Sequence, residues 1–284
     1  MSEHLDTAMN FIGGKLAPSF SGQQFEVESP FFPGLKRVIP NSDNVDLSFA
    51  VSNAKKASQT ASRLTFVQRK EILKKAADKL SANDDELEYL VKFQGIPKKV
   101  ARQKVKEVSY LLKSLPEFVS SRYSTNTSDK LFHLYDSSGF VWKREIDGII
   151  SSFIASNDIR ESAFVFGHIV LTGNTCIMKP SSVESYFPVK LANLITECGY
   201  PAGGLNVILF DTQDKSRHSL TYSIITESRA RILFGDDATL EMLRFEILPD
   251  GTVIDHGRKG SFVLFGTGGA KICPFWHGRS KNYC

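Results

Sequence analysis

The chain has 284 residues, of which 42% are hydrophobic and 23% are charged, as expected for a soluble globular protein with one large or two small domains. Its net charge of +4 is small, and the lysines and arginines are spread along predicted helices, which argues against a nucleic-acid-binding face. No apolar run approaches the ~20 residues of a membrane-spanning helix, and the acidic N-terminal segment lacks the apolar core of a signal peptide.

The cysteine pattern favours a reducing compartment. Cys176, Cys198, Cys273 and Cys284 form neither a CxxC pair nor the spacing of a metal site. We therefore expect no metal ion and a cytoplasmic location. Cys176 and Cys198 are interpreted as core residues.

The first 120 residues are predicted to form a scaffold. Residues 11–40 are rich in glycine, proline and serine, which is typical of extended strands and turns. Apolar residues then recur at helical spacing in four stretches, with Pro116 expected to bend or end the last. We expect these helices to carry no chemistry and their lysine-rich faces to be solvated. The four stretches are 46–61, 65–80, 86–93 and 98–120.

A hairpin is predicted after this scaffold. Residues 131–135 and 140–144 have strand-like composition, and they flank the turn-forming sequence DSSG at 136–139. The unpaired edges of a projecting hairpin can pair with another chain. We therefore expect a homo-oligomer.

The central part of the chain, from Gly148 to Ile208, alternates strands with helices. A first apolar run breaks at Asn157, and a later one at 175–178 is continuous, as in a strand buried on both faces. Helices are expected over 161–171 and 187–198, and a further strand over 206–209. This alternation predicts an α/β fold with a doubly wound parallel sheet.

Polar residues follow the strands of this predicted sheet, where ligands bind in such folds. Asn157 follows the first strand, and Lys179, Ser181 and Ser182 follow or end the second. A lysine in this place can hydrogen-bond ribose hydroxyls or meet a phosphate. Taken alone, the lysine would more readily be interpreted as a surface residue, and Asn157 could belong to an ordinary turn.

Beyond residue 208 the pattern changes. Residues 222–225 and 231–234 are predicted to be short strands. The second ends at Gly235, and the two aspartates that follow are interpreted as caps of a helix over 238–245.

Several motifs carry a resemblance to a known family. The run TGNTCIMKPSS at 172–182, followed by GYPAGGLNVI at 199–208, resembles the cofactor-binding half of the aldehyde dehydrogenase superfamily. That family usually reads GN-apolar-KPS and then GxPxGxxNVV. The segment FIGGKLAPSFSGQQFEVESP at 11–30 extends the similarity upstream. Downstream, ILFGDDATLEMLR and IDHGRKGSFVLFG are similar to the fatty acyl-CoA reductase branch.

The resemblance implies a Rossmann-like domain that binds NADP or NAD. Lys179, Ser181, Ser182 and Gly235 would then form the cofactor site. Ser182 stands where many relatives carry a glutamate that grips the adenosine ribose hydroxyls and repels a 2′-phosphate. A serine does not repel it, so NADP is tolerated.

The resemblance also implies a catalytic cysteine, whose thiolate attacks a carbonyl carbon. Cys284, in HGRSKNYC, resembles the approach to that cysteine, and Arg279 and Lys281 would lower its pKa. Cys273 is the alternative thiol. Asn157 matches the asparagine whose amide stabilises the oxyanion.

The general base of hydrolytic relatives is absent from this sequence. Those relatives carry a glutamate before LGGK, whereas this chain reads FGTGG at 265–269. CoA-dependent relatives commonly lack the glutamate, because a thiol nucleophile needs less assistance. This difference points to acyl-CoA chemistry.

Two functions remain open from the sequence. One is an oxidoreductase acting on a small-molecule aldehyde or acyl-CoA with NAD(P) through a cysteine thioester. The other is a truncated, non-catalytic nucleotide-binding or assembly module. We expect the 284-residue chain to bind cofactor with little turnover. The expected division is an N-terminal part (1–123), an oligomerisation hairpin (124–146), a cofactor-binding core (147–271) and the start of a truncated or absent catalytic domain (272–284).

Overall fold

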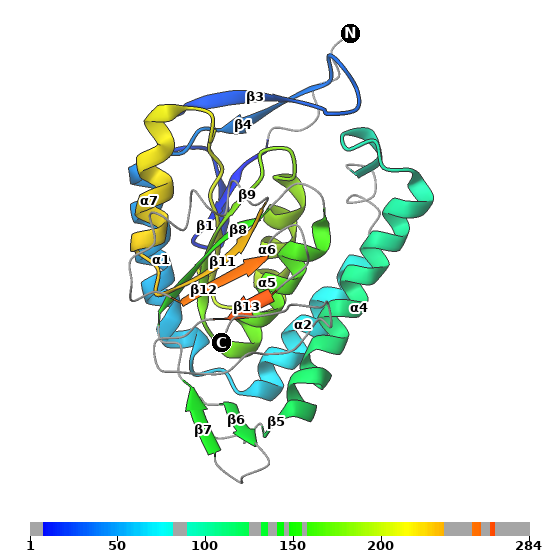
Figure 1. Ribbon diagram of the computed structural model, residues 1–284, viewed down its shortest axis with the longest axis vertical. Coiled ribbons are helices and arrows are strands. Elements are labelled where there is room, and N and C mark those ends of the chain that lie inside the picture. Colours follow the sequence, from blue (N-terminus) through cyan, green and yellow to red (C-terminus); the bar gives the residue numbers. More distant parts are fainter. Residues whose placement is uncertain are drawn as a thin grey trace.

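The computed structural model describes residues 8–81, 90–124, 132–135, 141–144, 148–154, 158–235, 252–256 and 262–264. The helices and strands of this part of the chain are arranged as Figure 1 shows. In chain order they are β1 (Asn10–Ile12), β2 (Lys15–Ala17), β3 (Gln24–Glu28), β4 (Lys36–Pro40), α1 (Asn44–Ala61), α2 (Phe66–Ser81), α4 (Lys98–Arg122), β5 (Tyr123–Ser124), β6 (Phe132–Tyr135), β7 (Val141–Arg144), β8 (Ile149–Ile154), α5 (Ile159–Thr172), β9 (Thr175–Pro180), α6 (Tyr186–Glu197), β10 (Leu205–Val207), a 3-10 turn η1 (Lys215–Arg217), α7 (His218–Thr226), β11 (Ala230–Phe234), β12 (Thr252–His256) and β13 (Phe262–Leu264).

An eight-stranded sheet forms the centre of the molecule, in the order β13-β12-β11-β8-β9-β10-β1-β2. The strands from β12 to β10 pair in parallel, whereas β1, β2 and β13 pair antiparallel. Every residue of β8, β9 and β11 is buried, as the continuous apolar run at 175–178 predicts. The predicted α/β fold with a largely parallel sheet is confirmed.

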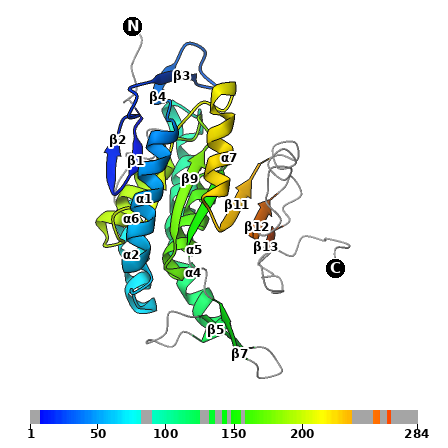
Figure 2. The same ribbon diagram turned by 90° about the vertical axis from the view of Figure 1, so that its left-hand side faces the viewer.

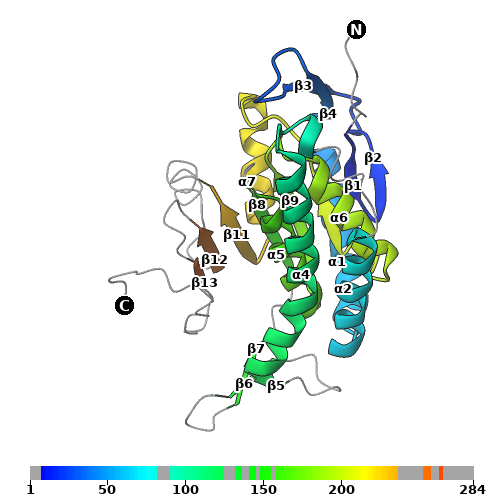
Figure 3. The ribbon, with the colours of Figure 1, turned by 90° about the vertical axis from the view of Figure 1, so that its right-hand side faces the viewer.

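Helices cover both faces of the sheet because successive strand residues point to opposite sides. Ile150 and Cys176 belong to a core shared with α2, α4, α5 and α6. Ile149 and Ile177 belong to a second core under α1 and α7. Figure 2 shows the face covered by α1 and α7, and Figure 3 shows the opposite face with α4 in front.

Local sequence signals set the helix ends. At the start of α1, Asp43 accepts hydrogen bonds from the backbone N–H groups of Val45 and Asp46, and the Asp46 carboxylate accepts one from Asp43 in return. Helix α5 ends at Gly173, which has the left-handed φ of 70°. Pro116 was expected to bend or end its helix; it does not end it, since α4 continues through it to Arg122. The predicted helix at 86–93 lies largely outside the described residues.

One predicted strand is wrong. Residues 222–225 belong to helix α7, in which Leu220, Ile224 and Ile225 are buried against the sheet. A short apolar run fits a strand as well as one turn of a buried helix, and here the helical contacts decide. The strand predicted at 231–234 is confirmed as β11.

The predicted hairpin is confirmed in β6 and β7, which pair antiparallel. β5 adds a third strand to this small sheet. It lies at the C-terminal end of α4, apart from the main sheet (Figures 1 and 2). Among the described helices, none is long and apolar enough to cross a membrane.

Candidate cofactor-binding site

The carboxyl ends of β11, β8 and β9 lie in register at one edge of the sheet. Leu233 pairs with Phe153, and Phe153 pairs with Lys179, so the three strands end together. The backbone N–H of Ser181 donates a hydrogen bond of 2.9 Å to the carbonyl of Ile154 and holds the loop after β9 against β8. Gly235 follows directly after β11. The structure thus brings Lys179, Ser181 and Gly235 to the same edge, as predicted.

Lys179 is buried at this edge rather than solvated. The residue is 6% exposed, and its Nζ lies 5.2 Å from the centroid of the Phe210 ring. Burial lowers the pKa of the Lys179 amine to about 8, although the negative charge of Asp211 opposes that shift. Within the described residues, the ammonium group has an aromatic face and a nearby carboxylate but no hydrogen-bond acceptor. A buried ammonium without an acceptor can donate to a ligand hydroxyl or phosphate oxygen.

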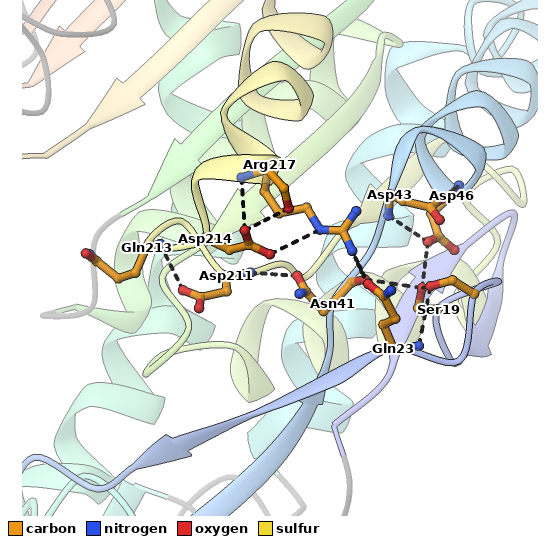
Figure 4. A network of polar contacts seen from close by, with 11 residues as sticks. Ser19, Gln23, Asn41, Asp43, Asp46, Asp211, Gln213, Asp214 and Arg217 are labelled. Carbon is orange, nitrogen blue, oxygen red and sulfur yellow. Dashed lines mark hydrogen bonds and ion pairs between the residues drawn. The ribbon is translucent and has the colours of Figure 1, made fainter.

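A polar network fixes the loop that carries Phe210 and Asp211 (Figure 4). The backbone N–H of Asp211 donates to Oδ1 of Asn41 at 3.1 Å, and Arg217 donates to the side chain of Gln23. These bonds fasten the loop between β10 and α7 to the N-terminal segment of the chain. Asp46 extends the network, since its carboxylate accepts from the hydroxyl of Ser19 and the backbone N–H of Asp43, each at 3.0 Å.

The loop after β9 also contains a buried acid that the sequence did not single out. Glu184, two residues after Ser182, is 1% exposed, and burial raises its pKa to about 8. Neither carboxylate oxygen has a partner in full hydrogen-bonding geometry. The backbone N–H of Phe187 and the charges of Arg37 and Lys104 nevertheless favour the ionised form, whereas Asp158 disfavours it. At neutral pH the carboxyl is therefore protonated and adds no negative charge beside Ser182.

Asp158 is the N-cap residue of α5 and directly follows the predicted oxyanion residue in the sequence. Its carboxylate accepts from the backbone N–H of Arg160 at 3.0 Å and caps α5, and the Lys104 ammonium lies 3.7 Å away. Burial raises the pKa of Asp158, but the hydrogen bonds and charges of Arg160 and Lys104 outweigh this effect and leave the pKa lowered. Asp158 is therefore an ionised cap, as the turn interpretation of this segment expects.

The residues proposed for catalysis are not placed by the structure. Asn157, Cys273 and Cys284 lie outside the described residues. The two described thiols are unsuited to nucleophilic attack, because burial raises the pKa of both Cys176 and Cys198. Within the described part of the chain, no three His, Cys, Asp or Glu side chains gather as a metal site would require.

Comparison with known proteins identifies the family. The model of the aldehyde dehydrogenase family matches residues 18–223, which is more than half of the chain. The chain belongs to the aldehyde dehydrogenase family. A mitochondrial aldehyde dehydrogenase of Leishmania tarentolae is 29% identical over 204 residues, covering 69% of this chain and 39% of that protein. The malonate-semialdehyde dehydrogenase of Halalkalibacterium halodurans is 28% identical over 200 residues, covering 70% of this chain and 41% of that protein.

Solved structures show the same aldehyde dehydrogenase fold. The NADP-dependent glyceraldehyde-3-phosphate dehydrogenase of Bacillus halodurans, complexed with NADP, superposes with a TM-score of 0.74 at 17% identity, over 90% of this chain and 54% of its own. The NAD-dependent benzaldehyde dehydrogenase of Corynebacterium glutamicum gives a TM-score of 0.71 at 19% identity, over 89% of this chain and 55% of its own. The chain thus spans about two fifths of these curated relatives and about half of these structures.

Proposed function

We propose that this chain binds NADP or NAD at the carboxyl edge of β8, β9 and β11. The observation that carries the proposal is the buried residue Lys179, whose ammonium group makes no hydrogen bond to another described residue. Ribose hydroxyls and phosphate oxygens would supply the acceptors that it lacks. Both solved neighbours cited above are named as NADP- or NAD-dependent enzymes of this fold, which supports the assignment.

The residues around Lys179 fit a dinucleotide. Ser182, half-buried after β9, would face the adenosine ribose without repelling a 2′-phosphate, and Glu184 beyond it is neutral at pH 7. Gly235 would let the backbone approach the pyrophosphate closely. We therefore propose that NADP binds at least as tightly as NAD.

We propose that the whole protein is an oxidoreductase acting on an aldehyde or an acyl-CoA. The bound nicotinamide would accept or donate the hydride. Cys284 would form the thioester with the acyl group, and the Asn157 amide would donate a hydrogen bond to the oxyanion. The acyl-CoA alternative is supported by the GDDATLEMLR and GSFVLFG motifs and by the missing glutamate before the FGTGG turn. A cytoplasmic homo-oligomer, assembled through β5–β7, completes the proposal.

A second candidate is a nucleotide-binding or assembly module without catalysis. It requires only the strand-end residues that the structure brings to one edge of the sheet, Lys179, Ser181 and Gly235, and no nucleophilic thiol. Reduction of NAD(P) by an aldehyde, or oxidation of NADPH by an acyl-CoA, separates the two candidates. The module would bind cofactor and leave its absorbance unchanged.

The cofactor site is tested by calorimetric titration of NADP, NAD and acyl-CoA into the chain. Lys179→Met keeps the aliphatic stem against Phe210 and removes the charge, so we expect it to weaken binding of both dinucleotides at least tenfold. Lys74→Met, on the exposed face of α2, is the matched control and should bind as the wild type does. Equal affinities in all three proteins would refute the assignment of Lys179.

A further inference from the structure

Exposed basic side chains gather at the N-terminal end of α4. Lys98, Lys99, Arg102 and Lys106 are all exposed. Among the described residues, none of the four has an ion pair or a hydrogen bond through its side chain. The acidic run at 84–88 lies outside those residues. Lys98, Arg102 and Lys106 recur every four residues and therefore lie along one side of the helix.

This arrangement is unfavourable to the isolated helix. Like charges four residues apart repel each other, and positive charges near a helix N-terminus oppose the helix dipole. No acidic residue lies in the first turn of α4 to offset them. From the sequence alone, the lysine-rich face of this helix is expected to be solvated. Solvation alone does not explain why like charges are aligned near the N-terminus of the helix. A negatively charged partner would turn the repulsion into attraction.

An apolar turn lies against the segment that leads into α4. In the turn between β3 and β4, Phe31 is 64% exposed and Phe32 is 45% exposed. Phe31 packs so closely on Gly95 that a Cβ atom at Gly95 would lie 2.8 Å from the Cβ of Phe31. Figures 1 and 3 both place this turn and the start of α4 at the same end of the molecule.

The turn is held rigidly, so its aromatic rings are presented in a fixed place. The hydroxyl of the buried Ser29 donates to the carbonyl of Phe93 at 2.6 Å. The same oxygen accepts from the backbone N–H groups of Phe31 and Phe32 at 3.3 and 3.1 Å. Leu35, at the end of the turn, packs against the core. Two aromatic side chains are thus kept exposed by a backbone that is itself anchored.

We propose that this basic–aromatic surface (Phe31, Phe32, Lys98, Lys99, Arg102 and Lys106) docks on an anionic lipid bilayer. Each lysine or arginine near such a bilayer strengthens attraction by about 1 kcal/mol, a factor of about five in partitioning. Exposed aromatic rings beside the charges can enter the interfacial region of the lipid, as in other peripheral proteins. A nucleic-acid duplex would account for the charges, but its stacked bases would leave the exposed phenylalanine rings without a role. The surface shares no residue with the proposed cofactor site, and the proposal does not depend on that site.

Vesicle sedimentation tests the proposal with the full 284-residue chain. Vesicles of phosphatidylcholine with one third phosphatidylserine should sediment the protein, and vesicles of phosphatidylcholine alone should not. Raising the salt to ~0.5 M should release it, because exposed charges are then screened. Lys98→Gln/Arg102→Gln should lower partitioning about 25-fold, as two factors of about five. Phe31→Ser/Phe32→Ser should lower it at least tenfold.

Matched substitutions separate this surface from general stickiness. Lys74→Gln/Lys75→Gln removes two exposed charges from α2, and Val67→Ser removes an apolar side chain that is 59% exposed; both should partition as the wild type does. No sedimentation with anionic vesicles would overturn the proposal. The proposal would also be overturned if the control variants lost as much vesicle partitioning as the surface variants. Binding to duplex DNA that the lysine–arginine variant loses and the phenylalanine variant keeps would instead assign the surface to nucleic acid.

Discussion

Replacing Glu184 with glutamine should stabilise the protein, and the gain should grow with pH. Glutamine has nearly the same shape as glutamate but carries no charge at any pH. Glu184 is almost completely buried, and burial raises its pKa from the ordinary value of 4.5 to about 8. The substitution therefore removes the charge that makes this side chain costly to bury as the pH rises, while the packing around it is kept.

The size and sign of the effect follow from proton binding. Below pH 4.5 the carboxyl is protonated in both the folded and the unfolded chain. Between pH 4.5 and 8 the unfolded chain releases the proton and the folded chain keeps it, so rising pH favours unfolding by about 1.4 kcal/mol per unit. The cost is about 3 kcal/mol at pH 7, and it levels off at about 5 kcal/mol above pH 8. Glu184→Gln should recover these amounts.

Urea unfolding followed by circular dichroism at pH 5.5, 7.0 and 8.5 measures the effect. Glu71→Gln, on the exposed face of α2, is the matched control and should shift the midpoint little at any pH. A stability gain for Glu184→Gln that is the same at all three pH values would refute the reasoning. A loss of stability at pH 8.5 would show that Arg37 and Lys104 stabilise the ionised carboxylate more than burial destabilises it.

Three further predictions concern the cofactor, the assembly and the thiol. Burial lowers the pKa of the Lys179 amine to about 8, so NADP affinity in calorimetry should fall as pH rises through 8, and Lys179→Met should flatten that dependence; the reverse trend would contradict the role of its charge. Deleting residues 130–142 should convert a dimer or larger assembly to a monomer in light scattering, whereas a wild-type monomer unaffected by the deletion would exclude the hairpin as the interface. Where turnover of aldehyde or acyl-CoA is measured by NADPH absorbance, Cys284→Ala should abolish it and Cys273→Ala should not; turnover that survives Cys284→Ala would place the nucleophile elsewhere.

Most of the fold could be predicted because its signals are local. The buried strand β9 is a continuous apolar run, and Gly173 ends α5 in the left-handed conformation that glycine favours. The residues of α7 gave no such signal, because its apolar run is short and its burial depends on α1 and the sheet beside it. Pro116 could be accommodated within α4, although a proline inside a helix commonly kinks or ends it.

The strand-end residues of the candidate site could be predicted for a similar reason. Lys179 and Ser181 are placed by the end of β9, and Gly235 by the end of β11, both of which the apolar pattern marks. Asp211 was not predicted, although it follows a strand in the same way. Its place beside Lys179 depends on a loop held by Asn41, which lies 170 residues earlier in the chain.

The charge at the site is the property that sequence could least supply. Lys179 lies at the end of β9, and Glu184 lies in the loop that follows it. From the sequence, one would be counted as a cation and the other as an anion, so their formal charges would cancel. Burial disfavours the charged form of both groups. It lowers the pKa of the Lys179 amine and raises the pKa of the Glu184 carboxyl, each to about 8. At neutral pH the amine remains protonated and the carboxyl is also protonated, so these two side chains together carry one positive charge rather than none. An anionic dinucleotide at this edge of the sheet therefore meets a site whose charge is set by desolvation, which only the packed structure determines.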